Sequence, residues 1–151
     1  QSNPRSVENL HREAEKRNVD PNRLVFARKM PLSKHLARHS LGDLALDTFN
    51  VNGHTTTSDA LWAGLPVLTK IGESFSSRVT ASLLSTIGLP ELITYSKKEY
   101  EDIALCLANN EKKLLAIKDK LIKYKKESPL FNSTLFTRDL ENKFIELLTK
   151  Y

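Results

Sequence analysis

The stretch NGHTTTSDALWAGLPVLT, residues 52–69, decides how this chain folds. A glycine turn at Gly53 leads into a hydroxyl-rich helix start, and the run GLP at 64–66 ends that helix before a short apolar strand at 67–69. Ahead of it, DLALDT at 43–48 is a compact buried-strand candidate, with the strand expected at 44–47. Strand, polar loop, helix start and strand form the pattern with which α/β folds build a phosphate site, because the free N–H groups and the dipole of the helix start favour an anion.

Elements on both sides extend this pattern. Toward the N-terminus we expect a helix from Asn3-Pro4 to near Asn18, a strand at 23–27, and a helix from Pro31 to about Ser40. Further helices are expected at 55–63, from Ser76 or Ser77 to Gly88, and at about 97–109, 111–126 and 135–149, with a last short strand at 92–94. Strands that alternate with helices over short connections predict an α/β fold, a Rossmann-like parallel sheet with flanking helices.

The length of the chain indicates one domain over 1–151, with an α/β part at about 1–95 and a helical part at about 97–151. The chain opens on a helix, so we expect the domain to be truncated on its N-terminal side. In a doubly wound sheet the first strands are the central ones. Residues 24–26 would then lack their neighbours, and we expect an exposed sheet edge there, with possible self-association through it.

Charge and composition argue against several classes of function. The net charge of +5 comes largely from the lysines of the helix at 111–126, which lie opposite an apolar stripe. Aromatic residues are scarce, so we interpret these lysines as a solvated face and expect no nucleic-acid partner. No run approaches the roughly 20 apolar residues of a membrane helix. The single Cys106 is interpreted as a small core residue, and the absence of an intrachain disulfide fits a cytoplasmic protein.

The hydroxyl cluster at 55–58 is the main candidate for chemistry. Its side chains either cap the helix or hydrogen-bond phosphate oxygens, and the residue types alone leave both open. Asp59 shares a helical face with Thr55 and is placed to bind ribose hydroxyls, or only supplies favourable charge near the helix start. His54 contacts either the ligand or its own turn.

Metal and cofactor signals are weak. His35 and His39 are four residues apart, which is metal-ligand spacing, but no third ligand and no Asp-x-Asp pair accompany them, so we expect no metal. Arg38 is a candidate contact to a base or a phosphate, or forms a surface salt bridge. The chain has no Walker loop and no Gly-x-Gly-x-x-Gly fingerprint, which argues against a nicotinamide enzyme.

Five segments together resemble the C-terminal catalytic half of the O-linked N-acetylglucosamine transferases: 43–48, 52–59, 61–69, 72–79 (GESFSSRV) and 128–132 (SPLFN). The wider family includes bacterial tetratricopeptide-repeat homologues and a plant O-fucosyltransferase branch. The resemblance covers the chain from about Asn22 to its end. It implies a GT-B-type enzyme with two Rossmann-like halves, and metal-independent, inverting transfer of a sugar from a nucleotide diphosphate to Ser or Thr.

The resemblance also implies residue roles. His54, Thr55 and Thr56 bind the diphosphate and Asp59 the ribose, while Met30, His35 and Arg38 contact the nucleoside and Val51 lies near the sugar. Family members that resemble the animal enzymes have a cysteine where Val51 stands and a lysine where Leu32 stands. The N–H groups of the helix start would stabilise the charge that grows on the leaving diphosphate without a metal.

By the same resemblance the catalytic residues, a diphosphate-binding lysine and the acceptor half lie outside this chain, so the chain alone is expected to be inactive. The expected partners are a UDP-sugar donor and, through the missing half, a protein or peptide acceptor, with no cofactor and no membrane. Two alternatives stay open. One is another GT-B glycosyltransferase with a different sugar or a small-molecule acceptor, and the other is a catalytically inactive nucleotide-binding or interaction module.

Overall fold

A computed structural model describes residues 3–150 of the chain. Its contacts form two compact units, of which the first ends at His35 and the second begins at Leu36. The short helix α2 (Leu32–Arg38) crosses this boundary, and each unit is described by itself below. The single domain expected over 1–151 stays a prediction.

The first unit is built from helix α1 (Pro4–Glu15) and the 3₁₀ turn η1 (Pro21–Arg23). The start of α1 follows from its sequence: the side chain of Asn3 accepts a hydrogen bond from the Arg5 N–H at 3.0 Å, and proline occupies the first helical position. Asn18 takes a left-handed conformation with φ 57°, which reverses the chain after the helix. The helix predicted from Asn3-Pro4 is therefore confirmed, although it ends at Glu15.

The strand predicted at 23–27 is wrong. Residues 24–31 have no regular secondary structure, and the ring of Phe26 lies against that of His11 with centroids 5.4 Å apart. A strand needs a neighbouring strand to accept and donate its backbone hydrogen bonds. The neighbour of this segment within the first unit is α1, whose backbone groups are mostly used inside the helix. The exposed sheet edge expected at 24–26 is wrong for the same reason.

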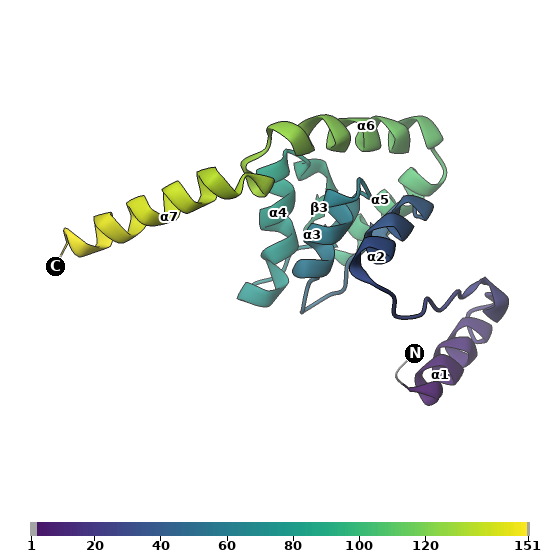
Figure 1. The fold of residues 1–151 in the computed structure, drawn as a ribbon. Helices are drawn as coiled ribbons and strands as arrows, with labels where there is room; N and C mark the ends of the chain where they lie inside the picture. Colours follow the sequence, from purple (N-terminus) through teal and green to yellow (C-terminus); the bar gives the residue numbers. More distant parts are fainter. Residues whose placement is uncertain (1–2, 151) are drawn as a thin grey trace. The chain divides into compact units, whose positions relative to one another are not determined.

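The second unit contains a three-stranded parallel sheet in the order β1 (Ala45–Leu46), β2 (Val67–Lys70) and β3 (Ile93–Thr94). Ala45 pairs with Val67, and Thr69 pairs with Ile93. The middle strand is buried at its first three residues, as a strand covered on both faces should be. The strands predicted at 44–47, 67–69 and 92–94 are confirmed, and so is the parallel sheet with flanking helices (Figure 1).

Within residues 36–150, the second unit contains five more helices, and all but the last of them connect or cover this sheet. They are α3 (Thr55–Trp62), α4 (Val79–Ile87), α5 (Lys97–Ala108), α6 (Glu111–Glu127) and α7 (Ser133–Leu148), with 3₁₀ turns η2 (His39–Leu41), η3 (Phe75–Ser77), η4 (Pro90–Leu92) and η5 (Pro129–Phe131). Helices α3, α4 and α5 contact β2, and α6 lies against all three. Local signals set several ends: Ser96 caps α5, and Gly88 ends α4 with φ 85°.

The core lies between the sheet and these helices. Leucines from α3, β2, α4 and α6 are fully buried: Leu61, Leu68, Leu84 and Leu121. On α6 the apolar stripe faces inward and most lysines are exposed, which confirms the solvated face predicted from the sequence. Two of its lysines form ion pairs, Lys118 with Asp43 and Lys120 with Glu91, each at 2.7 Å.

The expectation that Cys106 belongs to the core is wrong. Cys106 is exposed on α5, where the ammonium of Lys113 lies 3.4 Å from its sulfur. The next residue, Leu107, is buried instead. Adjacent residues on a helix point about 100° apart, so a residue beside a core position can still face solvent.

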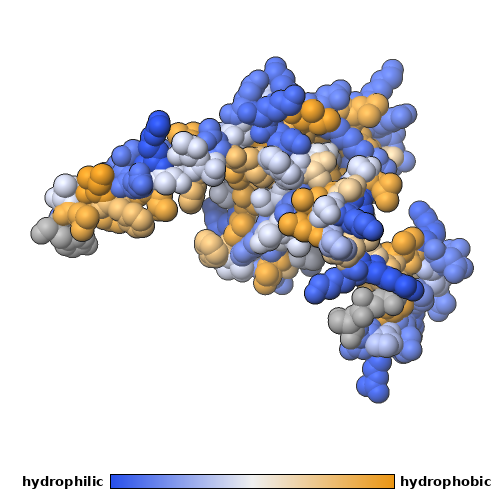
Figure 2. All heavy atoms as spheres, in the orientation of Figure 1, coloured by the Kyte–Doolittle hydropathy of each residue, from blue (hydrophilic) through white to orange (hydrophobic). Residues whose placement is uncertain are grey.

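Helix α7 is amphipathic, and all of its residues are exposed. Figure 2 shows apolar side chains gathered along it. They include Phe136, Leu140, Phe144 and Leu148. Within residues 3–150, no helix combines the length and the apolar character that a membrane crossing requires.

Candidate diphosphate site

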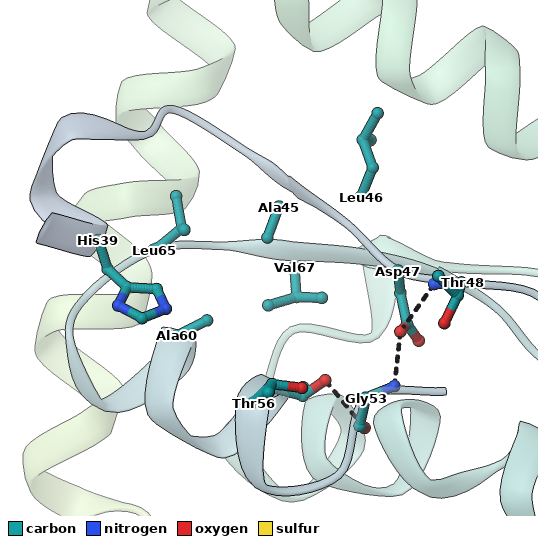
Figure 3. Close-up of a pocket in the computed structure, with 11 residues that line it drawn as sticks. His39, Ala45, Leu46, Asp47, Thr48, Gly53, Thr56, Ala60, Leu65 and Val67 are labelled. Carbon is teal, nitrogen blue, oxygen red and sulfur yellow. Dashed lines mark hydrogen bonds between the residues drawn. The ribbon is translucent and has the colours of Figure 1, made fainter. Parts of the chain in front are cut away.

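A cavity of about 320 Å³ lies beside β1 and β2 in the second unit, at the point where α3 begins (Figure 3). Its polar lining comes from two segments, the turn after β1 and the first turn of α3. These polar residues are Asp47, Thr48, Gly53, Thr56 and Thr57, and His39 adds a ring from η2. The cavity therefore occupies the strand-to-helix connection in which the sequence predicts a phosphate site.

The start of α3 is open. The N-cap residue is His54, with φ −104° and ψ −87°, and its side chain makes no capping hydrogen bond. The Ser58 N–H donates to the His54 carbonyl at 3.0 Å, so the N–H groups of residues 55–57 precede this first helical bond. The side chains of Thr55 and Thr56 are exposed. The alternative in which Thr55 or Thr56 caps the helix is wrong, because His54 is the N-cap and no side-chain capping hydrogen bond forms.

The peptide groups on both sides of Gly53 are held by three side chains, one of which is itself held by a residue of β2. The Gly53 N–H donates to Asp47 Oδ1 at 2.7 Å, and Asp47 Oδ2 accepts from the Thr69 hydroxyl, also at 2.7 Å. The Gly53 carbonyl accepts from the hydroxyls of Thr57 at 2.9 Å and Thr80 at 3.0 Å. These bonds fix the backbone immediately before His54.

The turn that precedes α3, residues 48–54, has no room for a side chain at Gly53. A Cβ atom there would lie 2.5 Å from Thr57 Oγ1 and 2.8 Å from Thr56 Oγ1. Both distances are too short for real Cβ contacts, so the glycine is required by space. The hydroxyls that crowd this position belong to the same first turn of α3 that offers its N–H groups.

Asp47 links the turn to the rest of the second unit. Besides the bonds above, its Oδ1 accepts from the Thr48 N–H at 2.9 Å. Its backbone carbonyl accepts from the Tyr100 hydroxyl at 3.0 Å. Burial, together with the negative charge of Asp47, raises the pKa of Tyr100 above its ordinary value. We assigned no role to Asp47 from the sequence, although a carboxylate at the end of a strand before a glycine turn is a usable signal.

The rest of the 48–54 turn is tied to η3. The Asn52 N–H donates to the Ser76 carbonyl at 2.8 Å, and the Ser76 hydroxyl donates to the Asn50 carbonyl at 3.1 Å. Asn52 is buried, and its Nδ2 donates to the Thr48 carbonyl at 3.0 Å. Between these anchors the side chain of Val51 is exposed, and its place near the sugar stays a prediction.

Two further predicted residues lie on the same helix start. The ring of His54 meets that of Phe75, from η3, nearly at right angles with centroids 6.2 Å apart. Asp59 is half-buried and follows Thr55 by four residues, so the two share a face of α3. The structure thus groups His54, Thr55, Thr56 and Asp59 on one helix start, with Val51 in the preceding turn.

Comparisons with known proteins identify the family of this chain. Residues 4–140 match glycosyl transferase family 41. The chain belongs to this family. Family 41 relatives include the UDP-N-acetylglucosamine–peptide N-acetylglucosaminyltransferase of Caenorhabditis elegans, 34% identical over 144 residues, and a probable enzyme of the same name from Arabidopsis thaliana, 37% identical over 130 residues. These alignments cover 95% and 85% of this chain but only 12% and 13% of the relatives.

A solved structure extends the match to the fold. A variant of the O-GlcNAc transferase of Thermobaculum terrenum superposes with a TM-score of 0.87 at 35% sequence identity. The superposition covers 94% of this chain and 27% of that one. The resemblance to the O-linked N-acetylglucosamine transferases and the GT-B-type fold class are therefore confirmed, for a chain that spans a minor part of each family 41 relative.

The remaining predicted residues lie on or before α2. Arg38 ends α2 in the second unit, His35 is the last residue of the first unit, and Met30 precedes the helix; all three are half-buried. Because they are divided between the two units, their grouping around a nucleoside stays a prediction. Among the side chains of residues 3–150, no three His, Cys, Asp or Glu groups are placed to hold a metal ion.

Proposed function

We propose that this chain is the nucleotide-sugar donor-binding part of a protein O-glycosyltransferase that uses a UDP-GlcNAc-type donor. One observation carries the proposal: the start of α3 is uncapped by any side chain and lies beside the 320 Å³ cavity, which Thr56 lines. The side chain of the preceding residue, Thr55, is exposed but does not line the cavity. An uncapped helix start combines free N–H donors with the positive end of the helix dipole. A diphosphate is the ligand that suits it.

The family relatives support the choice of donor and acceptor. Their names describe transfer of N-acetylglucosamine from UDP to peptides. For this chain we propose a UDP-sugar as donor and Ser or Thr hydroxyls of a protein as acceptor. Since the chain spans 12% and 13% of those relatives, transfer is proposed for the whole protein, and this chain alone is expected to bind the donor without transferring the sugar.

The chemistry that we propose for the site is stabilisation of the leaving group. As the bond between the sugar and the diphosphate breaks, negative charge grows on the diphosphate oxygens. The N–H groups of the first turn of α3, the hydroxyls of Thr55 and Thr56, and the His54 ring would donate to these oxygens. Fixed donors of this kind lower the barrier because they need no reorganisation during the reaction. We propose that they suffice without a metal, in an inverting displacement by the acceptor hydroxyl.

The other parts of the donor are assigned to the other predicted residues. Asp59 lies one helical turn beyond Thr55, and we propose that its carboxylate accepts hydrogen bonds from the ribose hydroxyls. Met30, His35 and Arg38 are proposed for the nucleoside. Val51, exposed before the helix start, is proposed to lie near the sugar. We further propose a cytoplasmic protein.

Amide spectra of the isotope-labelled chain, titrated with UDP in the presence of EDTA, test this proposal. We expect the largest shift changes at the amides of Thr55 and Thr56, because their N–H groups meet the phosphates directly. The amides of α7 serve as an internal control and should not move. Changes centred on any other element, or a requirement for magnesium, would contradict the proposed site.

A further inference from the structure

The hydrogen bond between Thr80 and Gly53 joins two segments 27 residues apart in the sequence. Thr80 lies on α4 and is 0% exposed. Its hydroxyl donates to the Gly53 carbonyl at 3.0 Å and lies 3.1 Å from the Thr57 hydroxyl. Thr57 lines the cavity, whereas Thr80 stands behind it. Thr80 therefore acts on any ligand only through the backbone of the turn.

We propose that Thr80 is a positioning residue that fixes the diphosphate-binding start of α3. The inference rests on the proposed function, because it takes this helix start to be the diphosphate site. The Gly53 carbonyl belongs to the peptide group that leads into His54. A hydrogen bond to this carbonyl fixes the plane of that peptide, and with it the direction in which α3 and its first-turn N–H groups begin.

Thr57 cannot perform this task alone. Its hydroxyl also donates to the Gly53 carbonyl, at 2.9 Å, but Thr57 belongs to α3 and moves with it. Thr80 belongs to α4, which packs against β2, so its bond ties the turn to the sheet. From the opposite side Asp47 holds the Gly53 N–H at 2.7 Å. The turn is thus held on both sides by groups outside α3, which is what a preorganised site requires.

The number of hydroxyl protons at this contact limits the loss of UDP affinity that we expect when the Thr80 hydroxyl is removed. The hydroxyls of Thr57 and Thr80 carry one proton each, and three contacts share them: two to the Gly53 carbonyl and one between the hydroxyls. Without the Thr80 hydroxyl, the Gly53 carbonyl keeps its bond from Thr57 and only the tie to α4 is lost. We therefore expect UDP affinity to fall about fivefold, equivalent to one neutral hydrogen bond.

Three variants of the chain test the role. Thr80→Val keeps the shape and removes the hydroxyl, and Thr80→Ser keeps the hydroxyl. Thr94→Val is the matched control, because Thr94 is also 0% exposed and its hydroxyl donates to the Thr69 carbonyl at 2.9 Å, within the sheet. For each variant we would measure the dissociation constants of UDP and uridine, and the stability against urea.

If Thr80 positions the turn, Thr80→Val weakens UDP binding about fivefold and leaves uridine binding unchanged. Thr80→Ser restores UDP binding. Thr94→Val lowers the stability without changing the ratio of UDP affinity to uridine affinity. A wild-type ratio in Thr80→Val, or the same change of ratio in Thr94→Val, would overturn the inference.

Failure of the proposed function would look different. If the unchanged chain did not bind UDP, that proposal would fall, and hydrogen exchange at the Gly53 amide would still test the tie to α4. That amide is bonded to Asp47 and should be protected. Positioning predicts faster exchange in Thr80→Val than in Thr94→Val. Equal exchange in the two variants would refute it.

Discussion

Substitution of Gly53 by alanine is predicted to damage both the stability of the chain and its donor site. The added Cβ would lie 2.5 Å from Thr57 Oγ1 and 2.8 Å from Thr56 Oγ1. Thr56 is exposed and its side chain can rotate away. Thr57 is 3% exposed, and its hydroxyl is bonded to the Gly53 carbonyl and lies next to that of Thr80, so its displacement breaks a buried hydrogen bond.

The two costs give the magnitude. Overpacking of a tight site costs about 1–3 kcal/mol, and the lost hydrogen bond adds about 1 kcal/mol, so Gly53→Ala should lower the free energy of unfolding by about 2–4 kcal/mol. The assay is urea unfolding followed by circular dichroism, with UDP titration of the folded variant. UDP affinity should fall by about tenfold or more, because the first-turn N–H groups lose their alignment.

Two comparisons make this prediction sharp. Gly42→Ala is the matched control, since its Cβ would meet Leu65 Cδ1 at 3.2 Å, the end of a flexible side chain, and should cost less than about 1 kcal/mol. Adding Thr57→Ala to Gly53→Ala removes the closest contact, so the double variant should be less destabilised than the sum of the two single variants. A Gly53→Ala variant as stable as Gly42→Ala, or purely additive effects, would refute the steric argument.

Three further predictions concern single side chains. Thr56→Ala should lose about 1–2 kcal/mol of UDP binding free energy, as for a charge-assisted bond, while Thr86→Ala on α4 should lose none; equal UDP titrations of Thr56→Ala and the unchanged chain would exclude a phosphate contact. Asp59→Asn should weaken the binding of UDP more than the binding of uracil, and equal losses of affinity for the two ligands would place Asp59 away from the ribose. The pKa of Tyr100 is higher in the folded state than its value of about 10 in the unfolded chain. The neutral phenol therefore contributes its full stabilisation below about pH 10, and this stabilisation is lost as the pH rises through the folded pKa. Urea unfolding from pH 9 to 11 should therefore show a shallower loss of stability in Tyr100→Phe, and identical slopes would contradict the shift.

Most helices of the second unit could be predicted because their signals are local. Gly88 ends α4 in a left-handed conformation, as predicted, and Ser96 starts α5 by accepting a hydrogen bond from the Glu99 N–H at 3.1 Å. The strand at 23–27 failed because strand formation depends on a partner that a sequence window does not contain. The prediction that Cys106 is a core residue failed because helical periodicity does not separate a core position from its neighbour, here Leu107.

The residues of the candidate site also separate into those with a local sequence signal and those whose role depends on long-range contacts. His54, Thr55, Thr56 and Asp59 could be proposed from the sequence because they are consecutive or one helical turn apart, so one motif contains them. Thr80 could not be found, since its partner Gly53 is 27 residues away and its residue type is unremarkable on a buried helix face. Contacts that support a binding turn from behind are long-range, and they become visible only when the fold is known.

The most direct test of the donor-site claim is calorimetric titration of the chain with UDP, UMP and ADP, each with EDTA and with magnesium. A uridine diphosphate site at the start of α3 predicts that UDP binds more tightly than both UMP and ADP, with the same affinity in EDTA and in magnesium. ADP binding equal to UDP binding, or UDP binding that appears only with magnesium, would contradict it.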